Sequence, residues 1–504
     1  MSRKGRHHKF WTAGVKFWTA GVAVTTLSVL SACGTTVSEE RLAAASGGGG
    51  TQQVAVVPGA AVPGQQDAAV AGVAAGTPGA PGTVPTAAAA TDAAVGTGGT
   101  GTGINKPAGA SQSTDGKSGS TTTGAAASGS APCERALAPI VVGQTLAASG
   151  FVGASIGNQR NGLALWAQAV NARGGVQCHP IRVVALDDGS DPARLRSNIN
   201  QLVDSDGAVA ILAAGVPIIG ATLKAAVEQK KVPAIGGDVV TSDWNESPFM
   251  FPQSAAALTT FYGSTIEAGR ANPAAKRAGI LYCVEANACT VIRKTFPEGA
   301  RKAGLENVLE KAVSVTQTDF TAECQALKSA GAEVVFLSID GASAQRVARS
   351  CSSLGYKPSY ATIAIAISGT SAQDPNLQAA GTFLGSATTP YLTSDTPGMK
   401  MFQEVIKQFA GSQRIDQSTL TGYSSGLLFE AALAKVADKA RAGEVTPELV
   451  MEGLWQLKNE KLGGIGAGVT FAKGKNAVSA PCYFALGVRV GGFWAPRGSK
   501  PQCL

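Results

Sequence analysis

The region from residue 139 onward alternates short apolar runs with longer stretches of helical length. Apolar runs of strand length occupy residues 140–142, 181–186, 209–212 and 232–235, with helical segments at 162–172, 192–205 and 218–229. In the first helical segment Leu163, Trp166 and Val170 recur at the helical period, which predicts one buried face. Pro192 is well placed in the first turn of the next helix. Strands that alternate with helices predict a parallel sheet covered on both faces.

The same pattern then begins again. Further helices are expected at 261–268, 290–303, 322–330 and 343–354, with strands at 278–282 and 334–338. Segments near 251–254, 387–391 and 463–469 are expected to cross between the two halves. We therefore expect an α/β protein with two Rossmann-like lobes and parallel-rich sheets: lobe 1 from 133–253 and 391–464, and lobe 2 from 254–390 and 465–504. A crevice between such lobes, at the strand ends, is a natural ligand site.

The N-terminus has the features of a secretion signal. Basic residues precede an apolar stretch that begins near Phe17 and ends at Leu30-Ser31-Ala32-Cys33. That ending resembles the lipobox of bacterial lipoproteins, in which the cysteine thiol is acylated after cleavage. The alternative is a transmembrane helix, but the apolar run is shorter than the about 20 residues that a span needs. We expect residues 1–32 to be a signal peptide and Cys33 to be the lipidation site.

Residues 33–132 predict a disordered tether. They consist largely of Gly, Ala, Thr, Ser and Pro and contain few large apolar side chains, so they cannot bury enough surface to offset chain entropy. The segment 96–101 formally matches G-x-G-x-x-G, but neither a strand nor a helix flanks it, so it is not a nucleotide site.

The charge excludes one class of partner. Residues 1–32 carry five lysines and arginines and no acid, so their removal lowers the formal charge from +8 to +3. The remaining charge is spread along the chain without basic clusters, which gives no support to nucleic-acid binding.

The cysteine count indicates an oxidising compartment. Apart from Cys33 there are eight cysteines, an even number that predicts disulfides. Sequence alone cannot choose among the pairings, but proximity along the chain favours Cys133–Cys178, Cys283–Cys289, Cys324–Cys351 and Cys482–Cys503. A zinc site is the alternative, and it is disfavoured because the mature chain has one histidine, His179, and no Cys-x-x-Cys. We expect no metal and no cofactor.

Four stretches carry a family resemblance: 171–176 (Asn-Ala-Arg-Gly-Gly-Val), the acidic turn 187–192, 232–235 (Val-Pro-Ala-Ile) and the segment from 422–423 into helix 427–436. In order and spacing they resemble the branched-chain amino-acid type of solute-binding protein, the extracytoplasmic receptors of ABC importers. The resemblance covers residues 139–494. It implies the Venus-flytrap, type I periplasmic-binding-protein fold, with ligand held between lobes that close by hinge bending and then dock on a membrane permease.

The resemblance implies ligand contacts on two loops of lobe 1. The first begins a helix with glycine before it and proline in its first turn, so backbone N–H groups near Gly215 and Val216 are expected to hold an anion. The serines usual there in such receptors are missing. The second loop contains Gly237, which permits close backbone approach, and Asp238, which can accept from an ammonium or hydroxyl group or instead cap a turn.

Further candidate ligand residues are expected on the first loop and in lobe 2. Gln144, Thr145 and Phe151 offer amide, hydroxyl and aromatic surface, although Phe151 can equally belong to the core. The loop 360–367 lacks the acid that pairs with a ligand amino group in amino-acid receptors, and Asp340 is the nearest substitute. This departure disfavours a free amino acid and favours uncharged, apolar or aromatic carboxylate-bearing solutes.

An enzyme is the remote alternative. Residues 422–426 match the G-x-S-x-G of hydrolase nucleophile elbows, with Ser424 as the nucleophile. That motif needs a preceding strand and a histidine base, but residues 417–420 are a poor strand and His179 lies upstream. We expect no catalytic residues.

The sequence thus predicts a lipid-anchored receptor on the outer face of the cell membrane. It would capture a small molecule between two lobes and deliver it to an ABC import permease. The alternative is a ligand sensor of the same fold that signals to a membrane partner.

Overall fold

The computed structural model describes residues 133, 135–150 and 152–504. The expected signal peptide (1–32), the lipidation site Cys33, the expected tether (33–132) and the candidate Phe151 lie outside the described residues. Among the residues that are described, no helix combines the length and the apolar character needed to cross a membrane.

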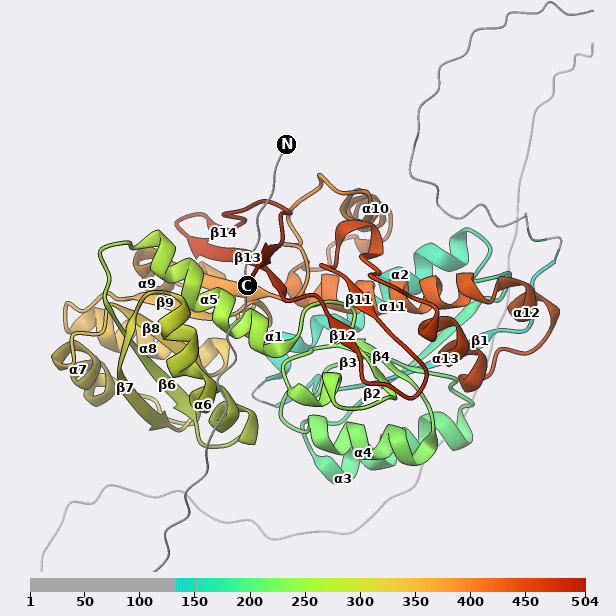
Figure 1. The fold of residues 1–504 in the computed structure, drawn as a ribbon, viewed down its shortest axis with the longest axis horizontal. Helices are drawn as coiled ribbons and strands as arrows, with labels where there is room; N and C mark the ends of the chain where they lie inside the picture. The colour runs from blue at the N-terminus through green and yellow to red at the C-terminus, as the bar shows by residue number, and fades with distance from the viewer. Residues whose placement is uncertain (1–132, 134, 151) are drawn as a thin grey trace, which may run out of the picture. The chain divides into compact units, whose positions relative to one another are not determined.

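The first lobe is built on a five-stranded parallel sheet of order β2-β1-β3-β4-β5. Its strands are β1 (Ile140–Leu146), β2 (Ile181–Asp187), β3 (Ile211–Ala214), β4 (Ala234–Gly237) and β5 (Met250–Phe251). Helices α2 (Asn158–Ala172), α3 (Pro192–Asn200) and α4 (Gly220–Lys230) connect successive strands, and Figure 1 shows α3 and α4 on the opposite side of the sheet from α2. The predicted α/β fold with a parallel sheet is confirmed.

A late segment of the chain returns to this lobe. Helix α11 (Gln417–Lys435) crosses α2 at small residues, and α13 (Pro447–Trp455) packs beside it (Figure 1). A β-carbon on Gly162 would lie 1.9 Å from the carbonyl oxygen of Thr419, and one on Gly422 would lie 2.0 Å from that of Gln159. The two helix backbones therefore touch, and only glycine permits this approach.

The second lobe is built on a mixed sheet whose main path is β14-β13-β10-β9-β8-β6-β7. Its strands are β6 (Arg277–Cys283), β7 (Glu306–Val313), β8 (Val334–Ser338), β9 (Ser359–Ile363), β10 (Thr382–Ser386), β13 (Cys482–Arg489) and β14 (Gly492–Trp494), with β15 (Gln502–Cys503) pairing beside β13. Strands β6 to β10 pair in parallel, whereas β13 pairs antiparallel with β10 and β14. The helices are α5 (Ala257–Ala271), α6 (Asn287–Lys302), α7 (Thr321–Ser329), α8 (Gly341–Ser353) and α9 (Pro375–Ala380). Of these strands the sequence analysis expected only β6 and β8. It treated residues 360–367 as a loop, but their first part belongs to β9, and it missed β7, a mostly half-buried edge strand whose charged positions hide its pattern.

The chain passes between the lobes after β5 and after β10, near the two expected crossings. The third passage comes later than expected. Ile465, Phe471 and Ala477 lie in the same apolar cluster as Phe251 of the first lobe, and the Phe251 and Phe471 rings meet edge to face at 5.1 Å. Because Cys482 begins β13, the chain enters the second sheet between Ala477 and Cys482 rather than at 465.

Four disulfides are present, with the pairing that proximity along the chain favoured. They join Cys133–Cys178 in the first lobe and Cys283–Cys289, Cys324–Cys351 and Cys482–Cys503 in the second. Each bridge lies within one lobe, so none restrains the lobes relative to one another.

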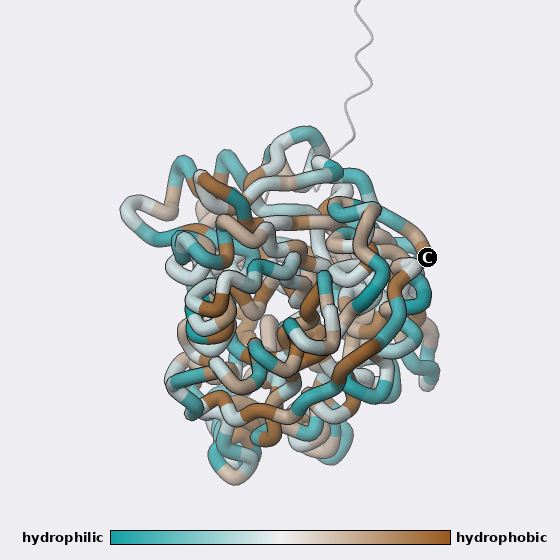
Figure 2. Tube along the Cα trace, turned by 90° about the vertical axis from the view of Figure 1, so that its left-hand side faces the viewer, coloured by the Kyte–Doolittle hydropathy of each residue, from teal (hydrophilic) through white to brown (hydrophobic). Residues whose placement is uncertain are grey.

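Apolar side chains fill the interior of both lobes. Trp166 and Phe429 in the first lobe and Phe336 and Tyr360 in the second are fully buried. Figure 2 shows hydrophobic segments running through the interior, while hydrophilic residues are concentrated on the outer turns. This distribution is the one that the alternating pattern of the sequence predicts.

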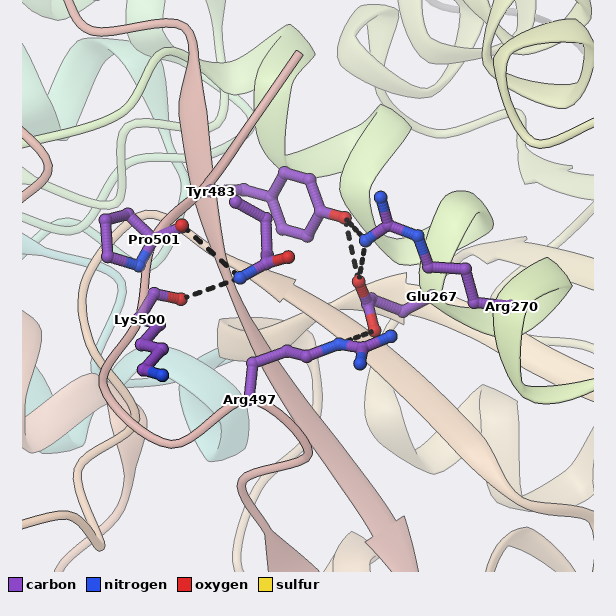
Figure 3. Close-up of polar contacts among 7 residues, drawn as sticks. Glu267, Arg270, Tyr483, Arg497, Lys500 and Pro501 are labelled. Carbon is purple, nitrogen blue, oxygen red and sulfur yellow. Dashed lines mark hydrogen bonds and ion pairs between the residues drawn. The ribbon is translucent and has the colours of Figure 1, made fainter.

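A buried carboxylate ties the C-terminal segment to α5 (Figure 3). Glu267 is 2% exposed and accepts hydrogen bonds from the Tyr483 hydroxyl at 2.9 Å and from Arg270 at 2.7 Å on one oxygen. Arg497 donates to its other oxygen at 3.1 Å. Because the two arginines are partly exposed, they neutralise the buried charge while remaining hydrated.

Candidate functional site

A cavity lies between the two lobes at the carboxyl ends of the parallel strands. It encloses about 730 Å³ of empty space, including space open to solvent. We call it the interlobe cavity. Its lining residues from the first lobe are Val152, Ser155, Ile156, Pro217, Ile218 and Val240. Those from the second lobe are Phe261, Cys283, Ala286, Ala288, Cys289, Ile292, Val315, Phe336, Leu337, Ser338, Ile339, Asp340, Thr362, Ile363, Ile365 and Ala366.

The polar side chains of this lining are few, and three of the four are bonded within the protein. The Ser155 hydroxyl donates to the Ala366 carbonyl across the lobes at 3.0 Å, and the Thr362 hydroxyl donates to the Leu337 carbonyl at 2.7 Å. The Asp340 carboxylate accepts from the N–H groups of Ala342 and Ser343 and caps the start of α8.

The fourth polar residue is Ser338, at the end of β8. It is 7% exposed, and its hydroxyl oxygen has no hydrogen-bond partner among the described residues. A buried hydroxyl without a partner is unfavourable, so a bound molecule that supplies one gains from it.

A disulfide loop forms part of the second-lobe wall. Cys283 ends β6 and Cys289 lies in the first turn of α6, and the bridge between them closes a loop whose Ala286 and Ala288 also line the cavity. The bridge holds these small apolar side chains in place beside the ligand space.

A polar pocket adjoins the interlobe cavity and shares Ser155 and Asp340 with it. It encloses about 1220 Å³ of empty space, including space open to solvent, and Asn158, Arg414 and Asp416 contribute to its lining. Asp416 is buried and accepts from the Asn158 amide at 2.7 Å, and desolvation raises its pKa. Mainly apolar side chains therefore line the interlobe cavity, and polar side chains are more frequent in the pocket beside it.

The candidates Gln144 and Thr145 lie in strand β1 and not on a loop. The Gln144 amide donates to the Ala213 carbonyl at 3.0 Å, while its Oε1 has no partner among the described residues, and the Thr145 hydroxyl donates to the Asp188 carboxylate at 2.8 Å. Both side chains are fully buried and neither lines the interlobe cavity. Their contact with a ligand stays a prediction.

The candidates Gly215, Val216, Gly237 and Asp238 do not line the interlobe cavity. Gly237 ends β4 and donates to the Gln253 side chain, and Asp238 lines a smaller pocket that shares Val240 with the cavity. Of the candidates that the structure describes, only Asp340 lines the interlobe cavity.

Asp238 occupies the backbone donors that the sequence analysis assigned to a ligand anion. It is 4% exposed and accepts from the N–H groups of Val216 at 2.6 Å and Val240 at 3.1 Å. Burial raises its pKa from 3.8 to about 6, although both backbone bonds act in the opposite direction. The expected anion cradle with Pro217 in the first helical turn is wrong, because α4 begins at Gly220 and Val216 precedes it. The Asp238 carboxylate occupies the Val216 N–H that was expected to serve a ligand anion.

The sequence analysis missed most of the lining residues, among them Ser155, Phe261, Phe336 and Ser338. Several stand at or just beyond the carboxyl ends of strands; Ser338, for example, ends β8. The position of a residue at the end of a predicted parallel strand is the signal that identifies such candidates.

The structure contradicts the hydrolase alternative. Ser424 lies inside helix α11, which already begins at Gln417, so no strand precedes it. Its hydroxyl is fully buried and donates to the Thr421 carbonyl at 2.9 Å. Both ring nitrogens of His179 contact backbone carbonyls, those of Ala138 and Ala440. Within the described part of the chain, no group of three His, Cys, Asp or Glu side chains could hold a metal ion.

Comparisons with known proteins agree with this architecture. A fatty acid ABC transporter substrate-binding protein from Thermomonospora curvata shares 20% identity at a TM-score of 0.59, covering 71% of this chain and 91% of that one. A solute-binding protein from R. palustris in complex with benzoate shares 18% at 0.57, covering 72% and 97%. A branched-chain amino acid ABC transporter protein from Thermus thermophilus with bound valine shares 16% at 0.60, covering 73% and 97%. At these identities the likeness shows the type I periplasmic-binding fold alone.

Comparison of the sequence with known proteins and with family models identifies the family of the chain. A search of curated proteins found no match. A family model described as "Periplasmic binding protein" matches residues 139–489, which is more than half of the chain. The protein therefore belongs to the periplasmic binding protein family.

Proposed function

We propose that the protein is an extracytoplasmic receptor that captures a small molecule in the interlobe cavity and delivers it to an ABC import permease. The observation that carries the proposal is the cavity itself, which both lobes line at their strand ends. The four disulfides leave the connection between the lobes free to bend, as closure on a ligand requires.

The relatives support a small organic solute. The solved structures similar to this chain include proteins described with fatty acid, benzoate and valine, each of which has an apolar part. A cavity walled mainly by apolar side chains is compatible with such a part.

The first experiment is a binding screen on the chain purified from residue 133 onward. Thermal midpoints are measured against amino acids, aromatic acids, amides, sugars and short peptides. A saturating ligand at a hundredfold excess over its Kd stabilises the folded state by about 2.7 kcal/mol. Capture in the cavity is supported if a ligand raises the thermal midpoint of the wild type and of Leu258→Asp but not that of Ile218→Asp. Ile218 lines the cavity, whereas Leu258 is an exposed residue of α5. Absence of any such shift across the panel contradicts the receptor function.

Delivery to a permease is tested with the ligand that the screen identifies. We expect cells that produce the Ile218→Asp variant to take up labelled ligand slowly and those that produce Leu258→Asp to take it up normally. Uptake that is unchanged, together with a loss of ligand-dependent gene expression, favours the sensor alternative.

We further propose that lipid at Cys33 anchors the receptor outside the cell. The Leu30-Ser31-Ala32-Cys33 sequence supports this proposal. Cys33→Ser is expected to move the protein from the membrane fraction to the soluble fraction and to abolish incorporation of labelled palmitate. Retention in the membrane fraction contradicts the anchor.

A further inference from the structure

We propose that the ligand of the interlobe cavity is a predominantly apolar, uncharged molecule with one hydrogen-bonding group, rather than a carboxylate or a free amino acid. This inference rests on the proposed receptor function and specifies its ligand class. It follows from the walls of the cavity, from the place of Asp238 and from the unpaired hydroxyl of Ser338.

The cavity offers no positive partner for a carboxylate. No lysine, arginine or histidine lies among its lining residues, and its only ionisable side chain is Asp340. A carboxylate buried without a cation is strongly unfavourable, and a neighbouring carboxylate adds repulsion. Arg414 lines the adjoining polar pocket and not the apolar cavity.

Two backbone donors beside the cavity are occupied by an internal carboxylate. The N–H groups of Val216 and Val240 both donate to the buried Asp238, which lines a smaller pocket that shares Val240 with the cavity. A ligand anion at these two N–H groups would have to displace a carboxylate that already has both donors.

A free amino acid also carries a carboxylate for which the cavity offers no positive partner. Its ammonium group could approach Asp340, whose carboxylate already accepts from two backbone N–H groups and from the Ser343 hydroxyl. Its carboxylate would remain in the apolar cavity without a cation, and the N–H groups of Val216 and Val240 already donate to Asp238. A neutral ligand brings no charged group into the cavity, so it does not pay for burying an unpaired charge.

Ser338 supplies the polar contact that a neutral ligand can use. It belongs to the wall, and its hydroxyl is the one polar side-chain group of the lining without a bond inside the described protein. The hydroxyl can donate or accept, so a ligand carbonyl, amide or hydroxyl within its reach satisfies it.

The test uses four probes that share a linear six-carbon chain: hexan-1-ol, hexanamide, hexanoate and norleucine. Each competes with the neutral fluorophore N-phenyl-1-naphthylamine for the purified full-length chain. We expect saturable binding of the fluorophore and displacement by the alcohol and the amide at concentrations at least tenfold lower than by hexanoate or norleucine.

Equal or better displacement by hexanoate or norleucine overturns the ligand class while leaving the receptor function intact. Failure of the fluorophore to bind saturably also overturns it. The receptor function is then decided separately by the broad panel of the thermal screen.

A pair of serine variants isolates the hydrogen bond. Ser338→Ala is expected to weaken hexanamide about fivefold, the equivalent of about 1 kcal/mol, without lowering the thermal midpoint of the empty protein. The matched control is Ser264→Ala, which removes a fully buried hydroxyl of α5 that is bonded to the Thr260 carbonyl and lies away from the cavity. The control should lower the midpoint and leave hexanamide binding unchanged. Unchanged hexanamide affinity in Ser338→Ala refutes the assigned contact.

Discussion

Replacing Asp238 by alanine should destabilise the empty protein, and by an amount that depends on pH. The substitution leaves the buried N–H groups of Val216 and Val240 without an acceptor. Each unsatisfied buried donor costs about 1–3 kcal/mol. We therefore expect Asp238→Ala to lower the free energy of unfolding at pH 5 by about 2–6 kcal/mol.

The pH dependence follows from the raised pKa of Asp238, which moves from 3.8 to about 6 on burial. A carboxyl group with a higher pKa in the folded protein binds its proton more tightly there, so it favours folding at low pH. This contribution is fully present below pH 3.8 and is lost as the pH rises through about 6. The difference between wild type and variant should consequently shrink by about 1 kcal/mol between pH 5 and pH 7.5.

Urea unfolding of both proteins at the two pH values measures this difference. The control is Asp340→Ala, which also removes the acceptor of two backbone N–H groups but at a partly exposed helix start, where water can replace it. That variant should lose about 1 kcal/mol. Unchanged unfolding of Asp238→Ala combined with lost ligand affinity would refute the structural role and restore Asp238 as a ligand contact. A difference that grows with pH would refute the electrostatic reasoning.

Three further predictions concern the stability of the fold, and urea unfolding measures the change in the free energy of unfolding for each. Glu267→Gln should cost about 2–3 kcal/mol, because it removes the buried charge that pairs with Arg270 and Arg497. A loss below about 0.5 kcal/mol would show that this carboxylate does not hold the C-terminal segment against α5. Joint replacement of Cys324 and Cys351 by alanine should cost about 3.5 kcal/mol, the chain-entropy value for a bridge of this span, and an unchanged urea midpoint would show that the bridge contributes nothing. Gly162→Ala should cost about 3 kcal/mol or more, since its β-carbon would lie 1.9 Å from the Thr419 carbonyl oxygen, and tolerance of alanine contradicts the contact between α2 and α11.

Much of the fold could be predicted because its signals are local. The spacing of apolar residues identified four of the five strands of the first sheet, but in the second lobe only β6 and β8 among the strands. Asp191 with Pro192 marks the start of α3, where the Asp191 side chain accepts from the Arg194 N–H. Local signals fail where an element depends on its neighbours. Strand β7 is half-buried at a sheet edge, and α11 begins ten residues earlier than the expected helix at Leu427 because Asp416 caps it within a buried contact to α2.

The candidate site shows the same division. Strand order along the chain predicted that loops at the strand ends would surround a crevice. Asp340 lines that cavity, and its contact with a ligand stays a prediction. Which side of the wall each side chain faces was decided only by packing. Asp238 turns inward because the buried N–H groups of Val216, 22 residues earlier, and Val240 need an acceptor.

The sequence by itself determined much of the alternation of strands and helices, and strand order indicated the general place of the crevice. For the cysteines it only favoured neighbours along the chain, and the folded lobes decided which pairs meet, across separations of 6 to 45 residues. Only the tertiary structure decided the chemistry of the cavity. The walls combine Ile218 and Val240 of one lobe with Phe336 and Ser338 of the other. The Ser338 hydroxyl is available to a ligand because no other described residue forms a hydrogen bond with it. Burial and hydrogen-bond satisfaction are properties of the assembled chain, so no local pattern encodes them.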